Sequence, residues 1–94
     1  MDDGDFQWDD AKAVRNVVRH GVSFDVARRV FDDSFAVEQI DDRERYGEER
    51  FSIIGMAAGR LLNVAYAMNG DAIRIISARA AEPFEHREYH EQNS

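Results

Sequence analysis

The chain has 94 residues, is 44% hydrophobic and 11% aromatic, and carries a formal net charge of −7 at pH 7. This length and composition fit one domain, residues 1–94, with a single modest core. The absence of cysteine excludes a disulfide framework, a thiolate nucleophile and a cysteine-ligated zinc ion. The acidic first residues and the lack of a long apolar run predict a cytoplasmic domain with no signal peptide and no membrane span.

The charged residues are arranged in blocks of alternating sign. Residues 1–10 and 32–49 are acidic, whereas residues 11–31 and 50–81 are basic. A negative net charge argues against binding to nucleic acid, but two basic blocks are compatible with a local site for a polyanion. Ordinary solvated surface charge is the alternative. We expect residues 1–5 to form a disordered acidic tail.

Two helices are expected in the first third of the chain. Residues 9–21 begin with aspartates that can cap a helix and end at Gly21, a natural residue for the C-terminal cap. Ser23 can cap a second helix that extends to Phe31, so the two helices form a tight hairpin. The apolar residues with helical spacing are Val14, Val17 and Val18 in the first helix and Phe24, Ala27, Val30 and Phe31 in the second.

Four strands and a last helix follow. The dipeptide Asn69–Gly70 predicts a type I′ hairpin, because both positions of that turn need a positive φ. Pro83 suits the first turn of the last helix, for which Phe84 and Tyr89 are the expected apolar anchors. The strands are expected over residues 35–40, 50–56, 60–68 and 71–79, with a charged loop over residues 41–49.

The order ααββββα predicts an α+β domain. We expect the two N-terminal helices to pack on one face of a four-stranded, mostly antiparallel sheet, with the C-terminal helix after it. The other face of such a sheet can remain partly open to solvent.

No short catalytic motif is present in the sequence. There is no phosphate-binding loop, no HExxH and no GxSxG. His86 and His90 are spaced i, i+4 on the last expected helix and could chelate a metal ion, but the sequence specifies no third ligand. We therefore expect no metal ion and no other cofactor.

Polar residues recur along the first expected helix, and an acid–base pair precedes the second expected strand. Lys12 and Asn16 share a helix face that Arg19 and His20 continue one turn later. An ordinary solvated helix face is the simpler interpretation of this pattern. The pair Glu49–Arg50, considered alone, is a surface pair worth little free energy.

Arg74 and Arg79 both lie on the last expected strand. Their separation of five residues places them on opposite faces of a regular strand. The two guanidinium groups can converge only if Arg79 turns at the end of the strand or if a β-bulge re-aims one of them. If they converge, the pattern suggests a site for a polyanion.

Several segments together resemble the BrnT family of toxins from type II toxin–antitoxin systems. The most specific are "FQWDDAK", "RHGVSF" and "RIISAR", in this order and at these separations, and the resemblance covers residues 6 to about 90. It implies a RelE-like fold and a metal-independent endoribonuclease that arrests translation. It also implies a BrnA-like ribbon-helix-helix antitoxin, which neutralises the toxin and connects it to operator DNA.

The resemblance also implies which residues act on RNA. Cleavage without a metal ion uses the 2′-OH as nucleophile and needs proton transfer and cations at the phosphorane. Arginine suits the second task because its planar fork binds phosphate and stays charged. We expect Arg74, Arg79 and Lys12 at the phosphate and His20 or Glu49 in acid–base work. The full set of matching positions is Lys12, His20, Glu49, Arg50, Arg74 and Arg79.

The chain departs from the family at its C-terminal end. Relatives usually have a basic last helix, whereas "AAEPFEHREYHE" is acidic here. Fewer cations weaken attraction to RNA. The main hypothesis is an active ribonuclease toxin. The alternative is a weak or inactive homologue that binds the antitoxin as a co-repressor, and a small metalloenzyme has only His86 and His90 in its favour.

Overall fold

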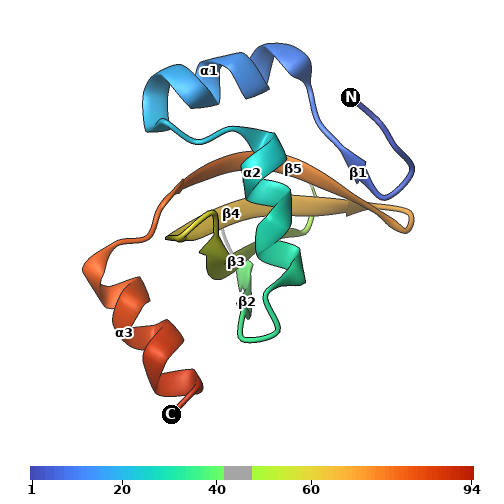
Figure 1. Cartoon of the computed structure of the whole chain (residues 1–94). Coiled ribbons are helices and arrows are strands. Elements are labelled where there is room, and N and C mark those ends of the chain that lie inside the picture. Colours follow the sequence, from blue (N-terminus) through green and yellow to red (C-terminus); the bar gives the residue numbers. More distant parts are fainter. Residues whose placement is uncertain (42–47) are drawn as a thin grey trace.

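The computed structural model describes residues 1–41 and 48–94 as an α+β domain with a five-stranded mixed sheet (Figure 1). The strand order is β1-β5-β4-β3-β2. The elements are β1 (Phe6–Gln7), α1 (Asp10–His20), α2 (Phe24–Ala27), the 3₁₀ helix η1 (Arg28–Asp32), β2 (Val37–Asp41), β3 (Arg50–Ala57), β4 (Arg60–Asn69), β5 (Ala72–Ala80) and α3 (Pro83–Gln92). The expected loop over residues 41–49 falls largely outside the described residues.

The predicted α+β class is confirmed, but the predicted number of four strands is wrong. The additional strand, β1, pairs parallel to β5 through Phe6 opposite Ile73 and Gln7 opposite Arg74. All other pairs are antiparallel. A strand of two residues is too short to show an alternating pattern, so the sequence carries no signal for it.

The first five residues, expected to form a disordered tail, make contacts in the structure. The Met1 ammonium group donates to the Trp8 carbonyl oxygen at 2.8 Å. Asp3 accepts from the Arg28 guanidinium at 2.8 Å and from the backbone N–H of Phe6 at the same distance. These contacts place residues 1–5 against β1 and η1.

The ends of the two N-terminal helices follow the expected capping rules. The Asp9 carboxylate accepts from the backbone N–H of Lys12, and the Ser23 hydroxyl accepts from that of Val26. Gly21 ends α1 with a φ of 68°, which a residue without a Cβ adopts at little cost. Figure 1 shows α1 at one edge of the sheet and α2 running across its face.

The main core lies between the sheet and the segment formed by α2 and η1. The apolar stripe expected for the second helix faces this core, although its second half is a 3₁₀ helix. At Gly55 of β3 a Cβ atom would lie 2.8 Å from Val30 Cγ1, so η1 and β3 approach too closely for any larger residue. The core includes Trp8, Phe24, Ala27, Val30, Ile53, Leu62, Val64, Tyr66, Ile75 and Ala78.

The spaced valines of α1 do not face the core. Val14, Val17 and Val18 are 66%, 47% and 84% exposed. The side chain that α1 buries is instead Asn16, which is 6% exposed. Apolar spacing therefore located the helix correctly, but it did not identify the buried face.

The type I′ turn lies in the β3–β4 hairpin and not in the β4–β5 hairpin, for which the sequence predicts it. Asn69 pairs with Ala72, so the loop is Gly70–Asp71, and of these two residues Gly70 has a positive φ. A type I′ turn needs two positive φ values, so that prediction is wrong. The β3–β4 loop, Ala58–Gly59, has φ values of 50° and 76° and meets this requirement.

The last helix packs on the opposite face of the sheet, near one end. Tyr89 is buried with Ile54 and Leu61, and its hydroxyl donates to Asp33 at 2.8 Å. Tyr89 is thus the expected anchor, but Phe84 is not, because it is 52% exposed. Within the described residues, no helix is long and apolar enough to cross a membrane.

Candidate functional site

A β-bulge interrupts the pairing of β4 with β5. Ala65 lies opposite Ser77, but the next residue, Tyr66, lies opposite Ile75. Ile76 therefore has no opposite residue on β4. One additional residue in one strand of an antiparallel pair shifts the alternation of its side chains by one position.

The bulge decides where the arginines of β5 point. Ile75 and Ala78 are three residues apart, yet both are buried in the main core. Arg74, Ser77 and Arg79 consequently lie together on the opposite face. The sequence analysis allowed two ways to bring the arginines to one face, a turn at the end of the strand or a bulge. The structure has the bulge.

A third arginine shares this face of the sheet. Ser52 lies opposite Ala65, which lies opposite Ser77, so the three residues form one row across the sheet. Arg50 is two residues before Ser52 on β3 and faces the same side. The face opposite the main core, hereafter the open face, thus carries Arg50, Arg74 and Arg79.

Arg74 is held by Glu48, a residue that the sequence analysis missed. The Arg74 guanidinium lies 2.6 Å from both carboxylate oxygens of Glu48, and the Arg50 guanidinium lies 3.6 Å from the same carboxylate. The hydrogen bond from Arg74 and the charges of Arg74, Arg50 and Lys12 together outweigh desolvation and lower the pKa of Glu48. Glu48 is therefore a carboxylate at neutral pH, and Lys12 lies within its electrostatic reach.

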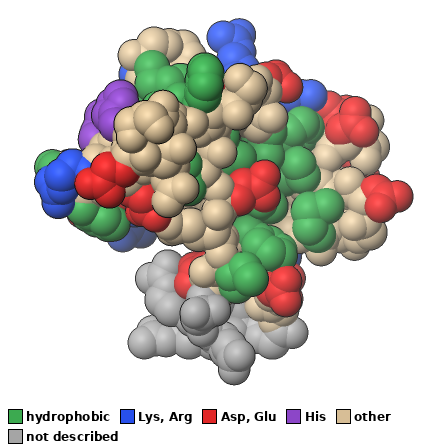
Figure 2. Space-filling view, turned by 90° about the horizontal axis from the view of Figure 1, so that it is seen from below, with side chains coloured by type: hydrophobic (Ala, Val, Ile, Leu, Met, Phe, Trp, Pro, Cys, Tyr) green, Lys and Arg blue, Asp and Glu red, His purple; other side chains and the backbone are tan. Residues whose placement is uncertain are grey.

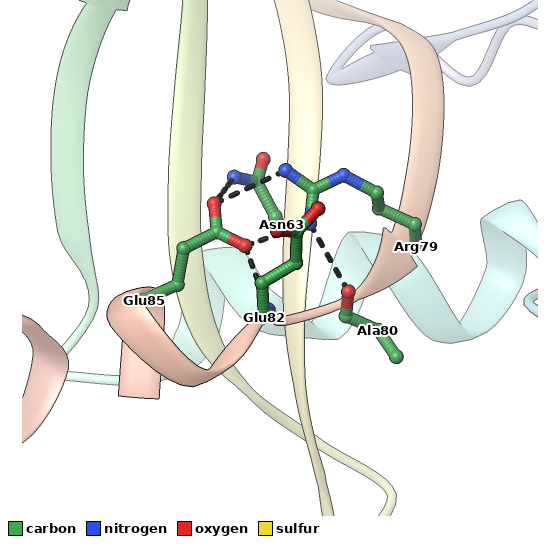
Figure 3. A network of polar contacts seen from close by, with 5 residues as sticks. All are labelled: Asn63, Arg79, Ala80, Glu82 and Glu85. Atoms are coloured by element: carbon green, nitrogen blue, oxygen red, sulfur yellow. Dashed lines mark hydrogen bonds and ion pairs between the residues drawn. The ribbon is translucent and has the colours of Figure 1, made fainter. Parts of the chain in front are cut away.

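Arg79 is held by Glu85 of α3 (Figure 3). Two nitrogens of Arg79 lie 2.7 and 3.2 Å from the two carboxylate oxygens, and Arg79 also donates to the Ala80 carbonyl at 3.1 Å. Glu85 is 3% exposed and accepts further bonds from Asn63 and from the backbone N–H of Glu82. The acidic last helix thus partly neutralises the arginine expected at the phosphate.

The pKa of Glu85 reflects two opposing effects. Burial raises the pKa of a carboxyl group, because it disfavours the charged form. Hydrogen bonds from Arg79, Glu82 and Asn63, with the charge of Arg79, outweigh burial and lower the pKa below its ordinary value of 4.5. Glu85 is therefore a carboxylate at neutral pH.

The remaining helix candidates line a groove between α1 and β5. This groove, hereafter the α1 groove, has a volume of about 520 Å³ and includes Lys12, Arg19 and His20 with Ile76 and Ser77. Lys12 and Ser77 lie at its junction with the open face. His20 is about two turns further along α1, so the structure does not bring it to the arginines.

Asn16 belongs to the same helix but not to a solvated face. Its amide donates to the carbonyl oxygens of Ala78 at 2.8 Å and Val22 at 2.9 Å, and its oxygen accepts from the Ala78 N–H at 3.1 Å. These bonds attach α1 to β5. The interpretation of Asn16 as solvated is wrong, because a helical period does not reveal which side meets a strand.

The predicted site residues thus fall into two groups. Lys12, Arg50 and Arg74 gather around Glu48, and Arg79 lies on the same face beside α3. Glu49 is exposed just before β3, next to Glu48, and His20 lies at the far end of the α1 groove. The three cations around Glu48 can bind the oxygens of an anion such as phosphate.

Charge on the lower side of the molecule is mixed. Figure 2 shows this side, where acidic and hydrophobic side chains are interspersed and basic ones lie near the margin. In residues 1–41 and 48–94, no group of three histidine or carboxylate side chains could hold a metal ion. Among the described residues, this view therefore shows no extended basic surface.

Comparison with known proteins yields one family. Residues 8–85 match the family model described as "Ribonuclease toxin, BrnT, of type II toxin-antitoxin system". No curated protein matches the chain. The match spans both groups of predicted site residues, from Lys12 to Arg79.

Proposed function

Since the chain belongs to the BrnT family of ribonuclease toxins of type II toxin–antitoxin systems, we propose that its open face cleaves RNA by a metal-independent endonucleolytic reaction that arrests translation in the cytoplasm. The observation that carries this proposal is that Arg74 and Arg79, through the bulge at Ile76, share one face of the sheet with Arg50 of β3. Lys12 adds a fourth cation at the junction with the α1 groove.

The proposed reaction begins with attack of a 2′-OH on the adjacent phosphorus. The 2′ oxygen forms a bond to phosphorus, its proton passes to a base, and the 5′ oxygen leaves with a proton from an acid. Negative charge grows on the phosphorane oxygens, where Arg74, Arg79 and Lys12 stabilise it. Phosphate oxygens replace the carboxylates of Glu48 and Glu85 on the two guanidinium groups.

Proton transfer falls to the side chains near this cluster. Glu49 follows Glu48 directly and is exposed at the start of β3, whereas His20 is two turns from Lys12. We therefore place Glu49 before His20 as the acceptor of the 2′-OH proton. An unperturbed histidine has the more suitable pKa, but a base must first lie within reach of its proton.

One observation favours the second candidate function, an antitoxin-binding co-repressor with weak or no ribonuclease activity. Arg79 is engaged by a buried carboxylate, and Glu82 lies 3.9 Å from the same guanidinium. RNA must displace Glu85 before it can use Arg79. The two functions differ in whether that displacement occurs.

Cleavage of RNA by the purified protein with EDTA present tests the proposal. We expect Arg79→Ala to lower the cleavage rate by about 10²–10³-fold, the usual loss when a donor to a transition-state oxyanion is removed. Arg60→Ala is the matched control, because Arg60 lies on the core side of β4, the face opposite to Arg79, and donates to Gly21. Circular dichroism verifies that both variants fold.

Parent protein that is folded but leaves RNA intact would support the co-repressor. Equal cleavage by the parent and Arg79→Ala would remove Arg79 from the reaction. The double variant Arg79→Ala/Glu85→Gln controls for the buried carboxylate that the single substitution leaves without its cation.

The family implies a protein antitoxin, and we propose a BrnA-like ribbon-helix-helix protein that covers α1 and connects this chain to operator DNA. Val14, Val17 and Val18 supply exposed apolar area on α1. The charged residues of the α1 groove, Lys12, Arg15 and Arg19, are all basic. A segment with apolar and acidic side chains complements this surface.

Val18→Asp tests that assignment. Val18 is 84% exposed, so the substitution should change the free energy of unfolding by less than about 0.5 kcal/mol. It should nevertheless abolish co-purification with the small ribbon-helix-helix protein encoded beside the toxin gene, because a charge enters the apolar contact. Val18→Leu should retain binding. Normal capture of Val18→Asp would place the antitoxin elsewhere.

A further inference from the structure

A second concave site lies on the open face, between β2 and the start of α3. It has a volume of about 300 Å³, at the lower end of the range for small-molecule pockets. Arg79 and Glu85 form part of its lining, but neither the family description nor the reaction above assigns a role to the other lining residues. We call it the sheet cleft.

The floor of the sheet cleft is one row of residues that crosses four strands. Gln39 lies opposite Ser52, Ser52 opposite Ala65, and Ala65 opposite Ser77. Small side chains at the centre of this row leave the hollow, and serine hydroxyls can both donate and accept hydrogen bonds. The floor is therefore suited to a flat, polar-edged group.

The charges around the cleft determine which part of a nucleotide can enter. Asp41, Arg79 and Glu85 are the charged residues lining it, and Arg79 is engaged by Glu85. As long as Arg79 is paired with Glu85, a phosphate inside would meet two carboxylates, whereas an uncharged ring would not be repelled. The cations that attract phosphate, Arg50 and Arg74, lie one row beyond the floor on the same face.

Phe84 gives the cleft an aromatic wall. It lies in the first turn of α3, lines the cleft and is 52% exposed. Tyr89, further along the same helix, provides the anchoring that Phe84 was expected to share. An exposed ring beside a polar hollow is the arrangement by which proteins stack unpaired bases.

We propose that the sheet cleft binds one unpaired nucleobase of a single-stranded RNA, with the base stacked on Phe84 and its edge on the hydroxyls of Ser52 and Ser77. The adjoining phosphates lie toward Arg50 and Arg74. Paired bases cannot enter, so the cleft selects single-stranded segments. The proposal rests on the proposed ribonuclease function, but base binding can be measured separately from cleavage.

The test uses a fluorescein-labelled RNA octamer of mixed sequence whose 2′ oxygens are methylated, so that it binds without being cleaved. A series of octamers replaces each base in turn by an abasic residue. For the parent protein we expect one position at which removal of the base weakens binding by about 5- to 100-fold, the usual effect of one stacked base.

Phe84→Ala should weaken binding of the intact octamer to a similar extent. For this variant, the abasic residue at that position should cause no further loss of affinity. Phe84→Trp should restore both properties. Phe35→Ala is the matched control, because Phe35 is 58% exposed and is not part of the cleft lining. A duplex of the same octamer should bind equally to the parent and Phe84→Ala.

The base site is refuted if Phe84→Ala and Phe35→Ala bind the octamers as the parent does, or if the parent binds none of them. The ribonuclease function fails separately, when the parent binds the octamer through Phe84 but leaves the unmethylated RNA intact. Unchanged thermal melting of Phe84→Ala verifies that the exposed substitution does not unfold the domain.

Discussion

Glu85 shows how one residue can link stability and function in this fold. Its carboxylate is almost fully buried and receives bonds from Arg79, Asn63 and the N–H of Glu82. A buried carboxylate is tolerated only when its hydrogen bonds are satisfied. The same bonds occupy Arg79, the arginine that we propose for RNA, so a structurally favourable contact competes with the proposed substrate.

The lowered pKa of Glu85 predicts an acid-sensitive contribution to stability. A carboxyl whose pKa is lower in the folded state stabilises the fold above its unfolded value, about 4.5, and loses that contribution as the pH falls through the folded pKa. Glu85→Gln should therefore flatten the decline of the unfolding free energy between pH 5 and pH 3. Urea titrations at a series of pH values measure the unfolding free energy of the parent and the variant.

Glu85→Gln should flatten the pH dependence of the unfolding free energy only in part. The pKa values of Asp3, Asp33 and Glu48 are lowered as well and act in the same direction. Glu91→Gln, which changes an exposed carboxylate at the end of α3, is the control. Identical pH profiles for Glu85→Gln and the parent would show that the ion pair contributes nothing.

At the scale of elements, α1 protects the edge of the sheet. Among the described residues, β1 pairs with two residues of β5, and no other strand lies beside that edge. Asn16 takes the place of a strand at Ala78, because its amide bonds both the N–H and the carbonyl oxygen of that residue. Unpaired edges invite association with other chains.

Asn16→Ala should destabilise the domain by about 2–4 kcal/mol, since it leaves buried backbone groups of Ala78 and Val22 without partners. Asn69→Ala is the control, because Asn69 makes one exposed bond to Gln7 and should cost less than about 1 kcal/mol. Urea unfolding followed by the fluorescence of Trp8 measures both. Equal losses would contradict a special role for Asn16.

At the scale of the whole molecule, a net charge of −7 surrounds a small basic cluster. Long-range attraction of RNA is therefore weak, and affinity depends on the few phosphates that the cluster neutralises. Glu48, which holds Arg74, is exposed and can give way to phosphate, whereas Glu85, which holds Arg79, is buried. Lys12, Arg50 and Arg74 are therefore the cations that we expect RNA to reach first. The acidic last helix thus acts mainly through one defined contact rather than through its overall charge.

This view predicts a shallow salt dependence. For single strands the slope of log K against log salt is about −0.7 per phosphate neutralised, so three cations give about −2. Glu85→Gln releases Arg79 and should steepen the slope to about −3. Titrations of the methylated octamer between 50 and 300 mM salt, about a sixfold range, measure both slopes. A parent slope near −6 would indicate a much larger basic surface.

Much of this protein was determined by local sequence. Helix caps at Asp9 and Ser23, the breaks between elements and the α+β order follow from rules that act over a few neighbouring residues. The arginines were found in the same way, through motifs that resemble the BrnT family. Such features need only the residue types and their spacing.

Tertiary structure alone decided the rest. The bulge at Ile76 depends on the register with β4, and the pairing of Arg79 with Glu85 depends on where α3 meets the sheet. The exposure of the α1 valines depends on which helix face Asn16 attaches to β5. Register and docking arise from contacts between distant segments, and no local period in the sequence specifies which of those contacts form.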